Sequence, residues 1–105
     1  MVIVYRDQIR VIYVIDCDDD VTAIFMDIPG NTDPLTMQCY AHIGQHSYCS
    51  MQWYSNDTKD ATPKQFKSLH QELLKIYDDS ELYIMNKIDK DAKLNRIAAI
   101  SRIYE

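Results

Sequence analysis

Glycine is almost absent from this sequence of 105 residues, which contains only Gly30 and Gly44. A glycine-rich loop of the kind that wraps a phosphate group is therefore excluded. The sequence also lacks an apolar run long enough to cross a membrane, and no charged start is followed by an apolar signal segment. We expect a single domain without membrane contact, because a chain of this length can bury one adequate core.

Cysteine occurs three times, at Cys17, Cys39 and Cys49, without a C-x-x-C pair. An odd number of cysteines does not make a disulfide framework, so reduced thiols and a cytoplasmic location are expected. A cross-strand disulfide between Cys39 and Cys49 is an alternative in an oxidising compartment. Packing of both as small apolar residues in the core explains them better.

Basic residues are scarce in the first part of the chain. Residues 1–60 contain three Lys or Arg against nine Asp or Glu, a balance of −6, whereas residues 61–105 contain eight against seven. This acidity disfavours direct nucleic acid binding, which depends on Lys and Arg neutralising phosphates. It is compatible with a basic protein partner, although moderate acidity is also common in ordinary globular proteins. A homodimer is left open.

Apolar periodicity predicts an α+β fold. Strands are expected over Met1–Tyr5, Ile9–Ile15 and Val21–Ile28 from their β-branched and aromatic residues. A turn at Asp18-Asp19 would pair Val11, Tyr13 and Ile15 with Met26, Ile24 and Thr22, respectively. The residues Cys17–Asp20, with Asp16, resemble a calcium loop only superficially, because the positions that need glycine and glutamate hold Val21 and Asp27. We interpret them as a solvated turn.

The second half of the chain contains the clearest helix start. Thr62, Pro63 and Gln65 form a capping box with proline at the first helical position, and apolar residues follow at helical spacing up to Tyr77. Asp78-Asp79-Ser80 should end this helix. A strand over Glu81–Ile88 and a short basic helix over Asp91–Arg102 follow, with a strand near Ile100–Tyr104 as an alternative. We predict an antiparallel sheet of about five or six strands with one main helix packed on one face.

The segment Thr36–Tyr54 has a nearly palindromic order of residue types around Gly44. A symmetric hairpin would pair Cys39 with Cys49, Tyr40 with Tyr48, and His42 with His46. Because side chains alternate between the faces of a strand, the cysteines would share a mostly apolar face with Trp53. The tyrosines and histidines would share the opposite, outward face.

The histidine pair permits two kinds of chemistry. Cys39, His42, His46 and Cys49 have a spacing that resembles a zinc site, but alternation sends the cysteines and histidines to opposite faces. His42 and His46 could instead act as acid and base in a small hydrolase or nuclease. The nearest cations in sequence, Arg10 and Lys59, are too distant to predict the required charge stabilisation. His70 has no carboxylate partner four residues away on its helix and is predicted to lie at the surface.

Three segments of the chain carry a resemblance to a known group. Asp27-Ile28-Pro29, the run Tyr40–Ser47 and the helix start Ala61-Thr62-Pro63 occur in the same order in small uncharacterised proteins of phages, plasmids and other mobile elements. The chain resembles these proteins over about residues 9–85. The resemblance implies an accessory product of a mobile element and supplies no activity.

Two functional hypotheses follow. The first is a small accessory protein that binds another protein, as a mobile-element modulator or an inhibitor of a host factor. Its predicted contact surface consists of Tyr40, His42, Gln45, His46 and Tyr48, because tyrosine is favoured at interfaces. The second is a hydrolase or nuclease that uses His42 and His46. We favour the first hypothesis, with no catalytic residue, cofactor or metal site predicted.

Overall fold

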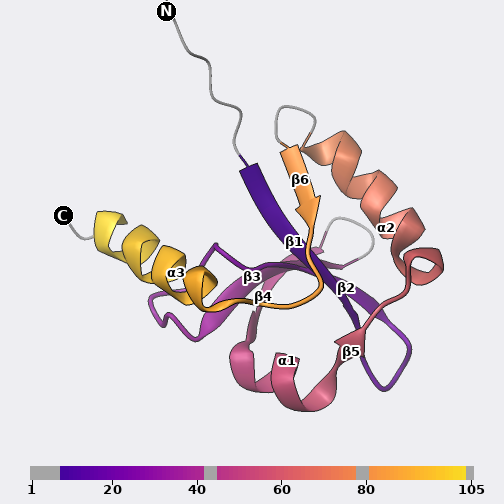
Figure 1. Ribbon diagram of the computed structural model, residues 1–105, viewed down its shortest axis with the longest axis horizontal. Helices are drawn as coiled ribbons and strands as arrows, with labels where there is room; N and C mark the ends of the chain where they lie inside the picture. Colours follow the sequence, from indigo (N-terminus) through magenta and orange to yellow (C-terminus); the bar gives the residue numbers. More distant parts are fainter. Residues whose placement is uncertain (1–7, 42–44, 78–80, 104–105) are drawn as a thin grey trace, which may run out of the picture.

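The computed structural model describes residues 8–41, 45–77 and 81–103. These residues form a sheet with helices on both faces (Figure 1). The strands are β1 (Gln8–Ile15), β2 (Val21–Phe25), β3 (Thr36–Ala41), β4 (Gln45–Ser50), β5 (Lys59–Asp60) and β6 (Glu81–Ile84). The helices are α1 (Met51–Asp57), α2 (Pro63–Ile76) and α3 (Lys90–Ile103). The predicted α+β class is confirmed, whereas the predicted strand over Met1–Tyr5 and the helix stop at residues 78–80 lie outside the described residues.

The sheet has the strand order β4-β3-β2-β1-β5, and β6 also pairs with β1. β2 runs along one edge of β1, and β5 and β6 share the other edge. β5 is antiparallel to the end of β1, at Val14 and Ile15, and β6 is parallel to its beginning, at Gln8–Val11. The parallel β6 is a departure from the antiparallel sheet that the sequence predicted, and α2 lies in the connection from β5 to β6.

Both faces of the sheet are covered. Every residue of β1 from Val11 to Ile15 is buried, and successive side chains of a strand point to opposite faces. One core layer joins Val11 and Tyr13 to Leu69 and Leu73 of α2, which confirms the predicted helix on one face. The other layer joins the alternate side chains of β1 to α1 and α3. It includes Ala92 and Trp53, so this face is not left open to solvent.

The β1–β2 hairpin differs by one residue from the predicted register. Val11 pairs with Phe25 and Tyr13 with Ala23, not with Met26 and Ile24. The reason is the loop, in which five residues separate the last pair, Ile15 and Val21. Sequence patterns did not reveal this because the paired residues, Val11–Ile15 and Val21–Phe25, are all apolar apart from Thr22.

The β3–β4 hairpin differs from the symmetric register by two residues. Tyr40 pairs with His46, Cys39 with Ser47 and Met37 with Cys49. Cys39 and Cys49 are therefore diagonal neighbours and are not directly opposite. A shift of two residues keeps every side chain on its face, so the predicted separation of the cysteines from Tyr40 and His46 is confirmed.

The predicted hairpin was too long because β4 ends at Ser50. The Ser50 side chain accepts a hydrogen bond from the backbone amide of Trp53, which makes Ser50 the N-cap of α1. Met51 and Trp53 consequently lie on a helix, and Trp53 is half-buried against the core layer below α1. The residues that the sequence predicted as a polar connection, from Ser55 onward, include the end of this helix and β5.

The two long helices occur where the sequence predicted them. Thr62 and Gln65 form the expected capping box of α2, with the Gln65 amide donating to the Thr62 hydroxyl oxygen at 3.3 Å and the Thr62 amide to the Gln65 side chain at 2.8 Å. α3 confirms the predicted C-terminal helix, so the alternative strand is wrong for residues 100–103. None of the described helices combines the length and apolarity needed to cross a membrane.

Candidate functional site

The loop between β1 and β2 is acidic and closely turned. Asp16 Oδ1 accepts hydrogen bonds from the backbone amides of Asp18 and Asp20, at 2.8 and 3.1 Å. Asp19 adopts a φ of 62°, which aspartate tolerates better than most residues. Cys17 and the three aspartates after it are exposed. The predicted solvated turn is confirmed, and its aspartates define the loop geometry as well as its charge.

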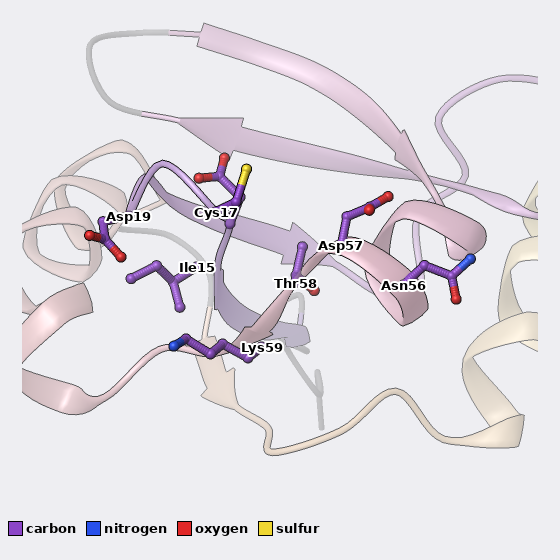
Figure 2. A pocket seen from close by; sticks show the side chains of 8 residues that line it. Ile15, Cys17, Asp19, Asn56, Asp57, Thr58 and Lys59 are labelled. Atoms are coloured by element: carbon purple, nitrogen blue, oxygen red, sulfur yellow. The ribbon is translucent and has the colours of Figure 1, made fainter.

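An open pocket of about 400 Å³ lies between this loop and the segment that joins α1 to β5. Figure 2 shows Cys17 and Asp19 on the loop side and Asp57, Thr58 and Lys59 on the other. Asp60 follows on β5, where it pairs with Val14. Asp16, Asp19 and Asp57 line the pocket, and Asp18, Asp20 and Asp60 are next to lining residues in the chain. We call these six aspartates the acidic end.

The acidic end adds Asp57 and Asp60 to the acidic run Asp16–Asp20, which is already visible in the sequence. Of the residues that line the pocket, Lys59 is the only cation. Oxygens of Asp16, Asp18 and Asp20 lie within 4.8 Å of one another, but exposed aspartates of a turn commonly have such spacing and are not by themselves a metal site. What the arrangement can do is attract a basic surface and repel a phosphate backbone.

The β3–β4 hairpin reaches the same end of the sheet. Ala41, the last residue of β3, pairs with Thr22 at the beginning of β2 and with Gln45 at the beginning of β4. Thr22 lies two residues after Asp20, so the hairpin and the acidic loop project from neighbouring strands. The structure therefore places the end of β3 and the beginning of β4 at the same end of the sheet as the acidic loop.

Tyr40 is not part of an exposed surface, which corrects the prediction for this residue. Its exposed fraction is 0%, and its hydroxyl donates a hydrogen bond to the Glu72 carboxylate of α2. The Tyr40 ring also meets the His46 ring edge-on, at a centroid distance of 4.7 Å. α2 packs over this face of the sheet, which a strand pattern alone could not show.

His46 and Tyr48 remain at the surface. His46 is exposed, and its Nε2 lies 2.9 Å from the Tyr77 hydroxyl. Tyr48 is 61% exposed and lies against Gly30, where an added Cβ would approach the Tyr48 Cβ to 2.4 Å. His42 lies outside the described residues, so the acid–base pair stays a prediction.

His70 was wrongly predicted as a simple surface residue. It is half-buried, and the Tyr13 hydroxyl lies 2.6 Å from its Nδ1. Burial lowers the pKa of His70 below its usual 6.5 and raises the pKa of Tyr13. A neutral imidazole whose Nδ1 accepts a hydrogen bond from the Tyr13 hydroxyl is therefore the favoured state. The sequence analysis missed this contact because Tyr13 and His70 are 57 residues apart in the chain.

All three cysteines are free thiols. Cys39 is buried, Cys49 is half-buried, and the Cys39 Sγ lies 3.2 Å from the Ser47 Oγ. A hydrogen bond with Cys49 lowers the pKa of the Cys39 thiol to about 6, and the same interaction raises the pKa of Cys49. A disulfide between directly opposite residues, the alternative considered from the sequence, does not fit the diagonal register.

Arg96 of α3 is a buried residue that sequence analysis did not identify. It is 1% exposed, and its guanidinium donates hydrogen bonds to the Met26 and Pro34 carbonyls, at 2.6 and 2.8 Å. Burial lowers the pKa of Arg96. The sequence of α3 contains several basic residues, and nothing in their spacing distinguishes the buried Arg96 from the exposed ones.

Comparisons with known proteins give no relative. No family model matches the chain, and neither a curated protein nor a solved structure matches it significantly. Function must therefore be argued from the geometry of these sites.

Proposed function

We propose that this protein is an accessory protein that binds a protein partner with a basic surface, using the acidic end as its main contact. The observation that supports the proposal is an open pocket lined by Asp16, Asp19 and Asp57, with Asp18, Asp20 and Asp60 adjacent in the chain to residues that line it. Complementary charge accelerates association and selects partners. A nucleic acid is a poor partner for this surface, since its phosphates carry the same charge.

The neighbouring hairpin supplies the less charged part of the contact. His46 and Tyr48 are exposed on β4, and Gln45 and His42 belong to the same predicted surface. Aromatic side chains at the centre and charged groups at the rim are the usual arrangement of protein interfaces. Tyr40 supports this surface from below by its contact with His46.

The biological role that we propose follows from the resemblance to proteins of mobile elements. An acidic protein that occupies the basic site of a host factor would compete with that factor's nucleic acid ligand. We therefore propose a modulator or inhibitor of a host process that acts in the cytoplasm. Free thiols at all three cysteines are consistent with such a reducing compartment.

A capture experiment with matched variants tests the proposal. Tagged wild-type protein, Asp18→Asn/Asp19→Asn and Glu81→Gln/Asp91→Asn would each be used to capture proteins from the native host, followed by mass spectrometry. Both variants remove two negative charges, but only the first pair lies at the acidic end. We expect a specific basic partner to bind the wild type and the second variant, and to be lost from the first.

The outcome also distinguishes binding from catalysis. Equal capture by both variants would contradict the acidic end as the contact surface. The double variant His42→Ala/His46→Ala should retain the partner with reduced affinity at most. If that variant instead abolishes a hydrolytic activity that the purified wild type shows, the enzyme hypothesis replaces the binding hypothesis.

A further inference from the structure

Sulfur-containing side chains gather on one face of the sheet. In the described part of the chain, the core layer below α1 and α3 contains every methionine and two of the three cysteines: Met26, Met37, Met51, Met85, Cys39 and Cys49. Methionine often fills irregular core space, so the number of these residues does not define a site. Their arrangement on β3 and β4 is more specific.

Three of these sulfur groups are neighbours across the β3–β4 ladder. Cys49 is directly opposite Met37, and Cys39 is diagonal to Cys49 on the same face. Side chains of directly opposite residues have Cβ atoms about 4.5–5.5 Å apart. The two thiols also influence each other's pKa, in opposite directions. Two thiols and one thioether therefore lie within a single small patch.

The diagonal relation favours a bridging ion over a disulfide. Diagonal residues have Cα atoms about 7–8 Å apart, whereas disulfides usually need less than about 6.8 Å. A metal ion bound to two sulfurs at about 2.3 Å each lets the sulfur atoms stay up to about 4.6 Å apart. Diagonal cysteines whose side chains face the same pocket can meet that requirement with less movement of the strands than a disulfide needs.

The surroundings supply a charge to balance an anionic complex. Two thiolates with a monovalent cation carry one net negative charge. Arg96 is buried on this side of the sheet, its guanidinium donates to two neutral carbonyls, and it acts electrostatically on Cys49. Ser47 lies 3.2 Å from the Cys39 sulfur and can donate its hydroxyl hydrogen to a thiolate there.

The thiols are also accessible from solvent. A pocket of about 290 Å³ is lined by Cys39 and Cys49 together with Thr22, Ala41, Ser47, Tyr48 and Trp53. The only tryptophan of the chain is therefore a wall of the same pocket. His46 lies on the opposite face of β4, so this pocket offers soft sulfur ligands without the imidazole that zinc sites commonly use.

We propose that Cys39 and Cys49, with the thioether of Met37, form a binding site for Cu(I). Soft thiolate and thioether ligands select this ion. Binding replaces the two thiol protons, so one Cu(I) and two thiols give an anionic bis-thiolate complex and two released protons. The site is separate from the acidic end and does not depend on the proposed protein partner.

An anaerobic titration of the reduced full-length protein with Cu(I), in competition with a chromogenic Cu(I) chelator, tests this proposal. We expect one bound Cu(I) per chain, a sulfur-to-copper absorption band in the ultraviolet and quenching of Trp53 fluorescence. X-ray absorption should show sulfur neighbours of the copper and no nitrogen. Binding of two chains per ion, or nitrogen neighbours, would contradict the proposed ligands.

Protection of the thiols from alkylation by bound Cu(I) can be measured in the wild-type protein, so this test needs no variant that could fail to fold. Bound Cu(I) should slow alkylation of Cys39 and Cys49 by iodoacetamide, as located by peptide mass spectrometry, while the exposed Cys17 stays reactive. Protection confined to Cys17 would overturn the proposal.

Substitutions then identify the ligands. Cys39→Ala or Cys49→Ala should abolish the absorption band, whereas Cys17→Ala should retain it. Met37→Leu should weaken Cu(I) binding, and Met85→Leu serves as its control, because Met85 belongs to the same core layer but hydrogen bonds to β1, away from β3. Undiminished one-to-one binding by both the Cys39 and the Cys49 variant would refute the site.

Discussion

Single buried polar side chains connect distant parts of this chain. Arg96 ties α3 to the carbonyls that follow β2 and precede β3, and Tyr13 of β1 meets His70 of α2. Such groups lose water on burial and must recover their hydrogen bonds inside the protein. Each of them should therefore contribute to stability in a way that its exposed neighbours do not.

Replacement of Arg96 tests this reasoning. Arg96→Met keeps the length of the apolar stem of the side chain but leaves the buried Met26 carbonyl and the half-buried Pro34 carbonyl without these donors. We expect the free energy of unfolding to fall by about 2–4 kcal/mol, measured by urea denaturation. Arg102→Met, at an exposed position of the same helix, should change it by less than about 0.5 kcal/mol. Equal effects of the two would contradict the role of Arg96.

His70 should make stability depend on pH. Its pKa is lowered in the folded protein, so the unfolded chain binds the proton more readily. The stabilisation from neutral His70 is present above its usual pKa of 6.5 and is lost as the pH falls below that value. We expect the Tm to decrease from pH 7 to 5, and His70→Leu to reduce that decrease. His46→Gln is the control, and a similar reduction in it would argue against His70.

At the scale of the element, α1 shows how a cap competes with a strand pattern. The alternation of Met37, Cys39, Cys49 and Met51 predicted a continuous strand, yet Ser50 starts a helix at Met51. A helix of only seven residues gains little from propensity, so its cap and its packing against the core layer decide its presence. The same change of structure limits β4 and places the hairpin in its observed register.

Loss of this cap should be measurable. Ser50→Ala removes the oxygen that accepts from the Trp53 amide, at 3.1 Å. We expect unfolding free energy to decrease by about 1 kcal/mol, with altered Trp53 fluorescence as a local signal. Ser55→Ala, on the exposed face of the same helix, should be neutral or slightly stabilising because alanine favours helices. A larger loss for Ser55→Ala would contradict this account.

At the scale of the whole molecule, charge and burial are unevenly divided. The sheet is covered on both faces, and six carboxylates gather at the end where β1, β2 and β5 meet. Carboxylates that are close together repel one another in the folded state. The acidic end thus lowers stability, a cost that a complementary partner surface would remove.

Salt should reveal this repulsion. Raising NaCl from low ionic strength to about 0.5 M shortens the screening length, so the Tm of the wild type should rise. The rise should be smaller in Asp18→Asn/Asp19→Asn than in Glu81→Gln/Asp91→Asn, as followed by circular dichroism. The same salt response in both variants would show that the acidic end is not the main source of repulsion.

The residue pattern by itself determined the local elements and the faces of the strands. Thr62 and Gln65 predicted the start of α2. Alternation of side chains placed Cys39 and Cys49 on one face of the hairpin and Tyr40 and His46 on the other. These features depend on neighbours within a few residues, which a sequence displays directly. The sequence likewise displayed the acidic run Asp16–Asp20, but not that Asp57 would lie next to it.

Only the tertiary structure decided what covers each face and which distant groups meet. α2 buries Tyr40, Arg96 enters the core from α3, and Asp57 joins the loop at Asp19. The pairing register of β3 and β4 was also decided by the tertiary structure, because a shift of two residues leaves every apolar side chain on the same face. Each of these outcomes depends on contacts between segments far apart in the chain, where local propensity has no influence.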